Sequence, residues 1–342
     1  MDNNIKKNPL SFQIDPGLFD KASDEEKAQV VTQRESVSFM KDAMRRFVKN
    51  KMAMTCLVIL ILITLIAIVV PMFYPYSYTK QDVSAKYLQP FEYSRKEQAK
   101  INKGEFVFPH IMGTDNLGRD YAIRVIYGTR ISLMVGFISA LIVVMIGILY
   151  GSISGYFGGK VDILLMRIAE IFNAIPFIPF AMILSAIMGT KNLTENTRIF
   201  IIMVILGVLT WSGLARLVRG QVLVVRESEY VTAAKAMGVK ENVIAFKHIL
   251  PNVMSVILVN LMLNFGTCML TESSLSYLGF GVAYPRPTWG NMLNGANNAT
   301  IINAYWWQWV FPAAFLAVTT ICINIVGDAL RDVMDPKSSV ER

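Results

Sequence analysis

The sequence predicts an all-α integral membrane protein with six transmembrane helices, and three observations support this prediction. Only 17% of the 342 residues are charged and 54% are hydrophobic, whereas about a quarter of the residues in a soluble domain are charged. Residues 52–70 include no charged residue, no Gly and no Pro, which is long enough to cross a hydrocarbon core of about 30 Å. That stretch also has no polar face, which a helix of a soluble protein would show.

The first apolar stretch follows some fifty polar residues and is too long for the apolar part of a signal peptide, so we expect it to stay in the protein. Five further apolar stretches follow, and the boundaries of each are expected to hold within a few residues. The six expected spans are 52–73, 131–154, 163–188, 199–218, 253–278 and 309–326.

Basic residues predict the orientation of these spans. Five lie just before the first span, and only Lys80 and Lys86 follow it within comparable reach, so the N-terminus is expected in the cytosol. The five are Lys41, Arg45, Arg46, Lys49 and Lys51. Six spans then return the C-terminus to the cytosol. Three other basic residues conflict with this orientation, because they precede the second span on the outer side: Arg119, Arg124 and Arg130. A long soluble segment, however, has little weight in this rule.

The spans divide the chain into five regions. Residues 1–38 are polar and without periodicity, which predicts a mobile cytosolic tail. Residues 39–74 combine an amphipathic surface helix with the first span. An extracytoplasmic segment occupies 75–128, the remaining five spans 129–328, and a cytosolic tail 329–342.

Composition argues against several functions. The chain has a formal net charge of +8, but the basic residues border apolar stretches, which favours membrane topology over nucleic-acid binding. Cys56, Cys268 and Cys322 lie in apolar segments without ligand spacing, so we expect them to fill space. No nucleophile–base pair or metal-ligand set is visible, and no Gly-x4-Gly-Lys-Ser/Thr motif predicts ATP binding by this chain. We therefore expect no catalysis and no bound cofactor.

A polar connection of some thirty residues, 219–252, joins the fourth and fifth spans on the cytosolic side. Ser228 is a plausible N-cap for a helix over 229–237 that Gly238 would end. Its small residues give it a thin flank that another protein can approach, and they are Ala233, Ala234 and Ala236. A second helix over 241–250 is expected to end at Pro251. Because a hairpin needs only a few residues, we expect this connection to dock a partner.

Here the sequence resembles a known family. Ala233-Ala234, three residues, Gly238 and then Leu250-Pro251 resemble the signature loop of ABC importer permeases, whose short helix docks on the ATPase subunit. Thr232 stands where the general pattern has Glu, and His248 where it has an aliphatic residue. Both departures resemble the dipeptide and oligopeptide branch, and Glu229 is the candidate for the missing carboxylate. The resemblance implies an ATPase-coupling set of Glu229, Tyr230, Thr232, Ala233, Ala234, Gly238, His248, Leu250 and Pro251.

Further segments are similar to the same branch, in the family's order, from Met40 to Pro336. They are 110–120, 155–159 with Asp162, 215–221, 275–281, 289–292, and 327–332 with Asp335-Pro336. The likeness is greatest to the C-type subunit of an ABC importer in a prokaryotic cell membrane. It implies a type-1 transmembrane domain over 129–328, a B-type permease, an extracellular solute-binding protein, a peptide substrate, and two ATPase subunits that bind ATP and Mg.

Three ionisable residues are candidates for a gate or path. Arg167 and Glu170 are three residues apart, and a surface ion pair or snorkelling to the interface fits them better than a gate does. Glu272 lies deep in apolar sequence, where ionisable groups are often functional, but it falls near the outer boundary of its span. His110 has no partner at ligand spacing, so we expect it to hold its loop without a metal.

Other functions stay open at this point. The same machinery could import nickel complexes, glutathione or another small solute. An ion-coupled secondary transporter would show inverted repeats and buried acidic residues at the midplane, and neither is clear. A receptor whose cytosolic loop docks a signalling partner is a third alternative.

Overall fold

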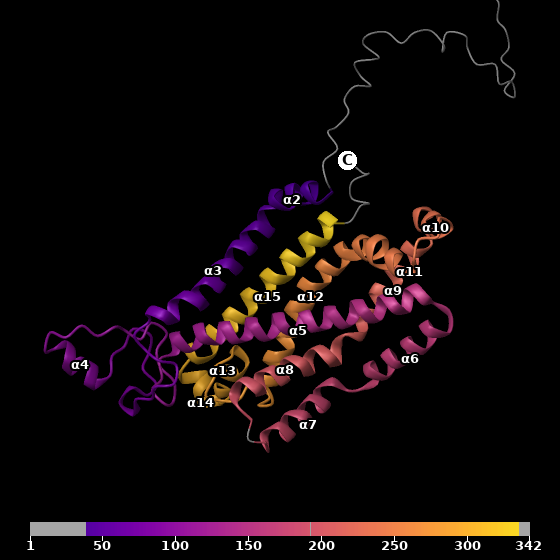
Figure 1. Cartoon of the computed structure of the whole chain (residues 1–342). Helices are drawn as coiled ribbons and strands as arrows, with labels where there is room; N and C mark the ends of the chain where they lie inside the picture. Colours follow the sequence, from indigo (N-terminus) through magenta and orange to yellow (C-terminus); the bar gives the residue numbers. More distant parts are fainter. Residues whose placement is uncertain (1–38, 192, 335–342) are drawn as a thin grey trace, which may run out of the picture. The chain divides into compact units, whose positions relative to one another are not determined.

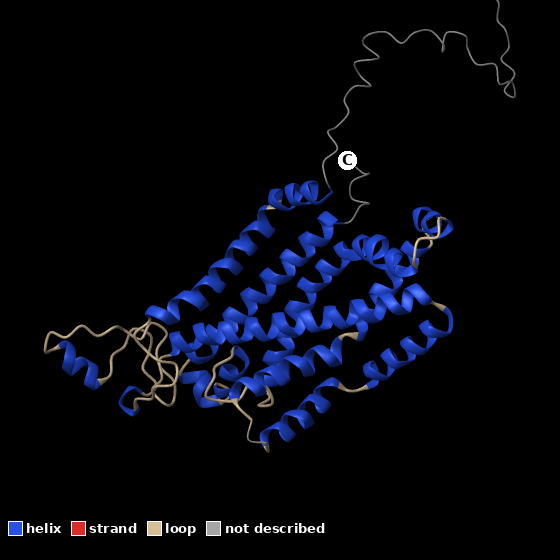
Figure 2. Ribbon diagram, viewed as in Figure 1, coloured by secondary structure: helices blue, strands red, loops and turns tan. Residues whose placement is uncertain are grey.

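The protein is described here by a computed structural model that covers residues 39–191 and 193–334. Figure 2 shows the described chain as helices joined by loops, with no strand in these ranges and one isolated β-bridge between Thr114 and Asp120. The expected N-terminal tail, and residues 335–342 of the expected C-terminal tail, lie outside the described residues. The chain divides into two units, 1–44 and 45–342, and the arrangement below concerns the second.

The long helices are α3 (Lys51–Phe73), α5 (Tyr121–Phe157), α12 (Leu250–Tyr277) and α15 (Trp307–Met334). Those of intermediate length are α2 (Phe39–Lys49), α6 (Gly159–Ala174), α7 (Phe177–Gly189), α8 (Glu195–Thr210) and α9 (Ser212–Arg226). The short helices are α4 (Arg95–Ile101), α10 (Glu229–Ala236), α11 (Glu241–Val243), α13 (Trp289–Gly295) and α14 (Ala299–Ala304). A 3-10 turn covers Val83–Ala85 and a π-helical segment Ile244–Ile249.

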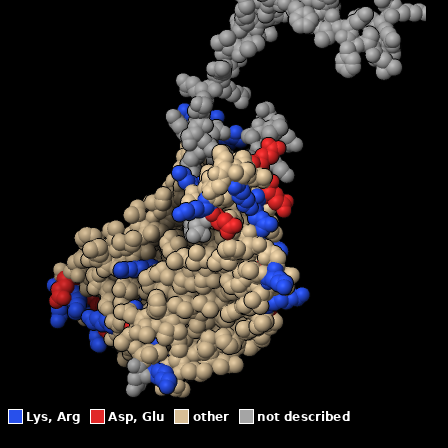
Figure 3. Space-filling view, turned by 45° about the vertical axis from the view of Figure 1, so that its right-hand side comes forward, with Lys and Arg blue, Asp and Glu red and all other residues tan. Residues whose placement is uncertain are grey.

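Four described helices are long and apolar enough to cross a membrane alone: α3, α5, α15, and α12 together with the end of the π-helical segment. Two bent pairs, α6 with α7 and α8 with α9, bring the number to six if each pair is one span. The expected count of six therefore stays a prediction. On the face drawn in Figure 3 most of the surface is uncharged, and Lys, Arg, Asp and Glu gather toward its margins, as a lipid-facing belt requires.

The two bends have local causes. α6 and α7 meet at 74°, and the break falls at Ile175, which is extended because it precedes Pro176. α8 and α9 meet at 47° at Trp211, whose buried ring packs 4.4 Å from that of Tyr150 and 5.4 Å from that of Phe172. The third and fourth expected spans are therefore broken helices.

α5 lies at the centre of this unit, against α3, α6, α8, α9 and α12, and α15 packs on α3 and α12 (Figure 1). α5 begins at Tyr121, earlier than the expected start at 131. Its 37 residues span about 55 Å, more than the bilayer core. Its first turns are buried and contact the segment between α3 and α5, to which Arg124 donates at the Tyr78 carbonyl.

The segment around α4, together with α13 and α14, lies around the start of α5, whereas α10 and α11 lie near its end (Figure 1). Two of the three arginines that disagreed with the orientation rule are buried at the start of α5. Only 8% of the Arg119 side chain and 2% of the Arg124 side chain are exposed, and Asp115 pairs with Arg119. They therefore offer little free charge to a membrane surface. Arg130 is exposed.

Candidate functional site

The expected docking helix is α10, and it starts and ends where the residue types predict. Ser228 is extended at the N-cap, but its Oγ donates to the Val225 carbonyl at 2.6 Å instead of capping an α10 amide. Gly238 has a φ of +77°, a conformation that residues with a Cβ rarely adopt. The Val239 amide donates to the Ala234 carbonyl at 3.1 Å, so the turn closes on the helix.

The inner face of α10 is packed on the rest of the chain. Val231 and Ala234 are buried, with 0% and 4% exposed, in one apolar cluster with Val222 and Ile249. The expectation that Ala234 belongs to the thin outer flank is wrong, because at helical spacing it shares a face with Val231. Ala234 holds α10 in place.

The outer face of α10 is open to solvent, with short side chains at Thr232 and Ala233. On α10 and its stop, the exposed members of the expected coupling set are Glu229, Tyr230, Thr232, Ala233 and Gly238. Thr232 Oγ1 donates to the Ser228 carbonyl at 3.2 Å, so its hydroxyl is turned back along the helix. A backbone on a partner surface can therefore approach Ala233 closely.

Two side-chain contacts fix α10 to other helices. Asn252 Nδ2, on the first turn of α12, donates to Tyr230 Oη at 2.6 Å. Lys235 Nζ lies 5.7 Å from the ring centre of Tyr156, near the end of α5, within the range of a cation–π contact. A force on α10 therefore reaches both α5 and α12.

The return from α10 to α12 differs from the expected second helix. That helix does not end at Pro251: α11 runs into the π-helical segment, which carries half-buried His248. α12 follows from half-buried Leu250, with exposed Pro251 in its first turn. In a regular α-helix the proline ring would clash with the carbonyl four residues back, and its nitrogen cannot donate. The wider π-helical turns fall where that clash would occur, as is common at functional sites.

A charged clamp holds the start of α6 to α9. Arg219 Nε and Nη2 donate to the two carboxylate oxygens of Asp162, each at 2.5 Å. Ser154 Oγ, on α5, donates to the same carboxylate at 2.5 Å. Arg226 Nη1 donates to the Tyr156 carbonyl at 2.7 Å. The α5–α6 turn and the C-terminal half of α9, which leads into α10, are therefore one connected block.

Glycines bring α5 and α9 into close contact at this block. Gly147, Gly151 and Gly155 are spaced by four on α5, and a Cβ at each would lie within 3.0 Å of α9. At Gly151 it would lie 2.4 Å from the Ala215 carbonyl oxygen, and at Gly155 2.8 Å from that of Arg219. Small residues at this spacing allow helices to approach closely in membranes.

Sequence reasoning missed the clamp and the glycine contact. Asp162 and Arg219 both lie in segments that resemble the family, but they are 57 residues apart, and no linear pattern pairs them. The spacing Gly147, Gly151, Gly155 did carry a signal, since glycines four apart in an apolar helix predict a close helix contact.

The comparisons with known proteins agree with this architecture. Residues 147–340 match the family model described as the binding-protein-dependent transport system inner membrane component. Residues 38–90 match the N-terminal TM domain of oligopeptide transport permease C. The first match covers more than half of the chain. The chain belongs to this permease family. It is therefore a multi-pass inner membrane protein and the non-catalytic, transmembrane component of a transport system.

Curated relatives extend over almost the whole permease. It is 39% identical to the dipeptide transport system permease protein DppC of Bacillus subtilis, over 89% of this chain and 88% of the relative. It is 40% identical to the oligopeptide transport system permease proteins OppC of Bacillus subtilis and Escherichia coli. Those matches cover 89% of this chain and 92% and 93% of the two relatives.

Two of the gate candidates of the permease pair with each other on the surface of α6, and the third is buried on α12. Arg167 Nη1 donates to Glu170 Oε2 at 2.7 Å on α6, and 73% and 52% of these side chains are exposed. Glu272, on α12, is fully buried, with 0% exposed, and accepts from Ser276 Oγ at 2.6 Å. A path-lining role for Glu272 would therefore require the packing around it to open.

The segment between α3 and α5 is tied to the start of α5 by polar contacts. His110 Nδ1 lies 2.7 Å from Asp120 Oδ2 and its Nε2 lies 3.2 Å from Glu97 Oε1. Asp120 also accepts from the Ile123 amide at 2.9 Å and so caps α5. Burial by itself would lower the pKa of His110, but the hydrogen bonds and charges of Asp120 and Glu97 outweigh it and raise this pKa. Across residues 39–191 and 193–334, no group of three or more His, Cys, Asp or Glu is placed to hold a metal.

Proposed function

We propose that this permease is the C-type subunit of an ATP-driven importer that takes up oligopeptides or dipeptides into a prokaryotic cell. Its relatives with 39% and 40% identity are named as dipeptide and oligopeptide permeases. The partners would be a B-type permease, two ATPase subunits that bind ATP and Mg, and an extracellular binding protein that delivers the peptide. The chain itself would bind no nucleotide.

One observation supports the coupling role: the inner face of α10 is packed on the rest of the chain, and its outer face is exposed. Its buried face is part of the cluster that includes Val222 and Ile249. Its exposed face includes Tyr230, Thr232 and Ala233. A helix with one apolar face buried and its opposite face exposed is suited to a protein partner, and we assign that place to the ATPase.

Attachment to several helices supports a mechanism. When ATP binding closes the two ATPases, each would push on its permease through α10. The contacts of Tyr230 with α12, of Lys235 with α5 and of Arg219 with α6 would move these helices together. The substrate path, shared with the partner permease, would then change the side to which it opens, with Arg167, Glu170 and Glu272 as candidates for the gate or path.

The position of basic residues supports a cytosolic location for α10. α3 starts with Lys51, and the end of α15 packs beside it, with Ala53 of α3 and Ala329 of α15 in one apolar cluster. Figure 1 shows these ends on the same side of the unit as α10. The positive-inside rule places this side in the cytosol, so α10 would face the compartment that supplies ATP.

The test is Ala233→Glu, a charge on the bare face of α10, with Ala99→Glu as the matched control. Ala99 is an exposed alanine on α4, near the opposite end of the unit. We expect both variants to reach the membrane in normal amounts. Uptake of labelled tripeptides, measured by mass spectrometry in cells that rely on this importer, should be lost only with Ala233→Glu, together with co-purification of the ATPases.

Equal uptake by the two variants would refute the coupling role of α10. If Ala233→Glu loses the co-purifying ATPases but the wild-type importer takes up no tripeptide, the coupling role holds and the peptide substrate is refuted.

A further inference from the structure

A cavity of about 430 Å³ lies at the start of α5, at the opposite end of the unit from α10. Its lining combines charged, amide and apolar side chains from the segment before α5, α5 itself, the loop before α13, α13 and α15. Those used here are Asp115, Asn116, Arg119, Arg124, Tyr284 and Gln308. The coupling role of α10 makes no use of this cavity.

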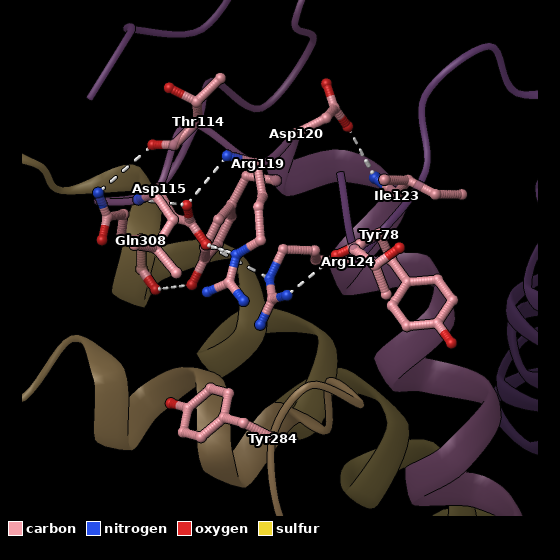
Figure 4. Close-up of polar contacts among 12 residues, drawn as sticks. Tyr78, Thr114, Asp115, Arg119, Asp120, Ile123, Arg124, Tyr284 and Gln308 are labelled. Carbon is pink, nitrogen blue, oxygen red and sulfur yellow. Dashed lines mark hydrogen bonds and ion pairs between the residues drawn. The ribbon is translucent and has the colours of Figure 1, made fainter. Parts of the chain in front are cut away.

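The cavity contains more positive than negative charge. Arg119 Nε donates to Asp115 Oδ2 at 2.7 Å, and Arg124 Nε lies 3.6 Å from the same oxygen. Figure 4 shows the two guanidinium groups next to Asp115. Asp120, the next carboxylate along the chain, is engaged with His110 and with the start of α5. One carboxylate therefore serves two buried guanidinium groups, and a buried unpaired charge is strongly unfavourable.

The two arginines also have unused donors. The Nε of Arg124 is buried and has no hydrogen-bond partner within the part of the chain that the structure describes. Its Nη1 donates to the Tyr78 carbonyl at 3.1 Å. Arg119 uses its Nε for Asp115, which leaves its terminal nitrogens for a ligand. In Figure 4 the terminal nitrogens of both arginines lie on the side toward Tyr284, across the cavity.

We propose that this cavity binds the C-terminal carboxylate of the peptide as it enters the importer, an inference that rests on the proposed function. Two guanidinium forks match the geometry of a carboxylate and bind it through paired hydrogen bonds. Asn116 offers its amide to the last peptide groups, and the ring of Tyr284 offers apolar area. Gln308, whose Nε2 donates to the Thr114 carbonyl at 3.4 Å, offers its amide oxygen. The volume falls in the range of small-ligand sites. In the proposed orientation the cavity faces the side from which the peptide arrives.

The test uses the importer with its partner permease and ATPases in nanodiscs, without the binding protein, and the probes Ala-Ala-Ala and its C-terminal amide. Isothermal titration should show that the free acid binds about tenfold or more tightly than the amide, since the amide loses charge-assisted hydrogen bonds. Arg119→Gln should remove this difference. Arg130→Gln, an exposed arginine farther along α5, should keep it. Equal affinity for the acid and the amide in the wild type would overturn the inference.

A second variant covers the case in which Arg119→Gln harms folding. Asn116 is exposed, so Asn116→Trp should fill the mouth of the cavity without touching the Asp115–Arg119 pair, and should weaken Ala-Ala-Ala binding. Retained affinity in a folded Asn116→Trp complex would overturn the inference.

The carboxylate could instead come from an acidic side chain of the binding protein. In that case Arg119→Gln would weaken docking of the binding protein and leave tripeptide affinity unchanged, which refutes the peptide site. Peptide uptake by the wild-type importer is the separate readout: if it persists while the acid and the amide bind equally, only this inference fails.

Discussion

Replacing Gly151 by Ala tests whether close contact of α5 with α9 holds the coupling block together. The new Cβ would lie 2.4 Å from the Ala215 carbonyl oxygen and 2.9 Å from Val218 Cβ. Ordinary contacts begin at 3.4 Å, so the two helices must separate by about 1 Å (3.4 − 2.4). The obstacle is backbone of a packed helix, which cannot rotate away. Such overpacking costs about 1–3 kcal/mol.

Gly220→Ala is the matched control. Gly220 lies on α9, and a Cβ there would meet no atom within 4 Å, so the change should be neutral or slightly stabilising through helix propensity. The assay is the thermal midpoint of the importer purified in detergent, followed by peptide uptake in cells. We expect a lower midpoint and weaker uptake for Gly151→Ala alone. Equal midpoints for the two variants would refute the argument that this contact is tight.

Three further predictions concern other contacts. In a double-mutant cycle, Arg219→Gln should lower the thermal midpoint more than Arg219→Gln combined with Asp162→Asn, because the single change leaves a buried carboxylate without its partner; additive effects would contradict the clamp. The pKa of His110 is raised above its ordinary 6.5, so the contribution of this histidine to stability should be complete below about pH 6.5 and fall as pH rises through the raised value. His110→Asn should flatten the pH profile of the midpoint, and an unchanged profile would refute this assignment. At Gly238, with φ +77° and open space around a Cβ, uptake should decline from Gly to Asn to Ala to Val, since only backbone strain of about 1–2 kcal/mol opposes the substitution; equal uptake would exclude a need for this conformation.

The structure changes how one substitution should be used. From the sequence, Ala234→Glu is an obvious way to disrupt docking. With 4% of Ala234 exposed, a glutamate there would be buried in an apolar cluster and would destabilise α10 itself. Docking can be tested at Ala233 without unfolding α10. Ala233 and Ala234 are adjacent in the sequence but lie on different faces of the helix.

Span boundaries show where periodicity and hydropathy fail as predictors. The expected second span began at residue 131, because apolar sequence becomes continuous there. α5 begins at Tyr121, since its first turns are held by distant parts of the chain: Tyr121 Oη donates to the Gln308 carbonyl and Arg124 Nη1 to the Tyr78 carbonyl. Hydropathy cannot detect such partners, because they come from residues distant along the chain.

The sequence by itself determined the membrane class, the short helix of the docking segment and its stop at Gly238, and the membership of a permease family. These follow from local properties: the length of apolar stretches, capping preferences, and motif order. Only the tertiary structure decided which face of α10 is free, that Asp162 joins Arg219, and that Arg119 and Arg124 share Asp115 beside a cavity. These features depend on how helices rotate and pack against one another. Rotation of a helix about its axis by one residue position changes all of its contacts, although its composition stays the same.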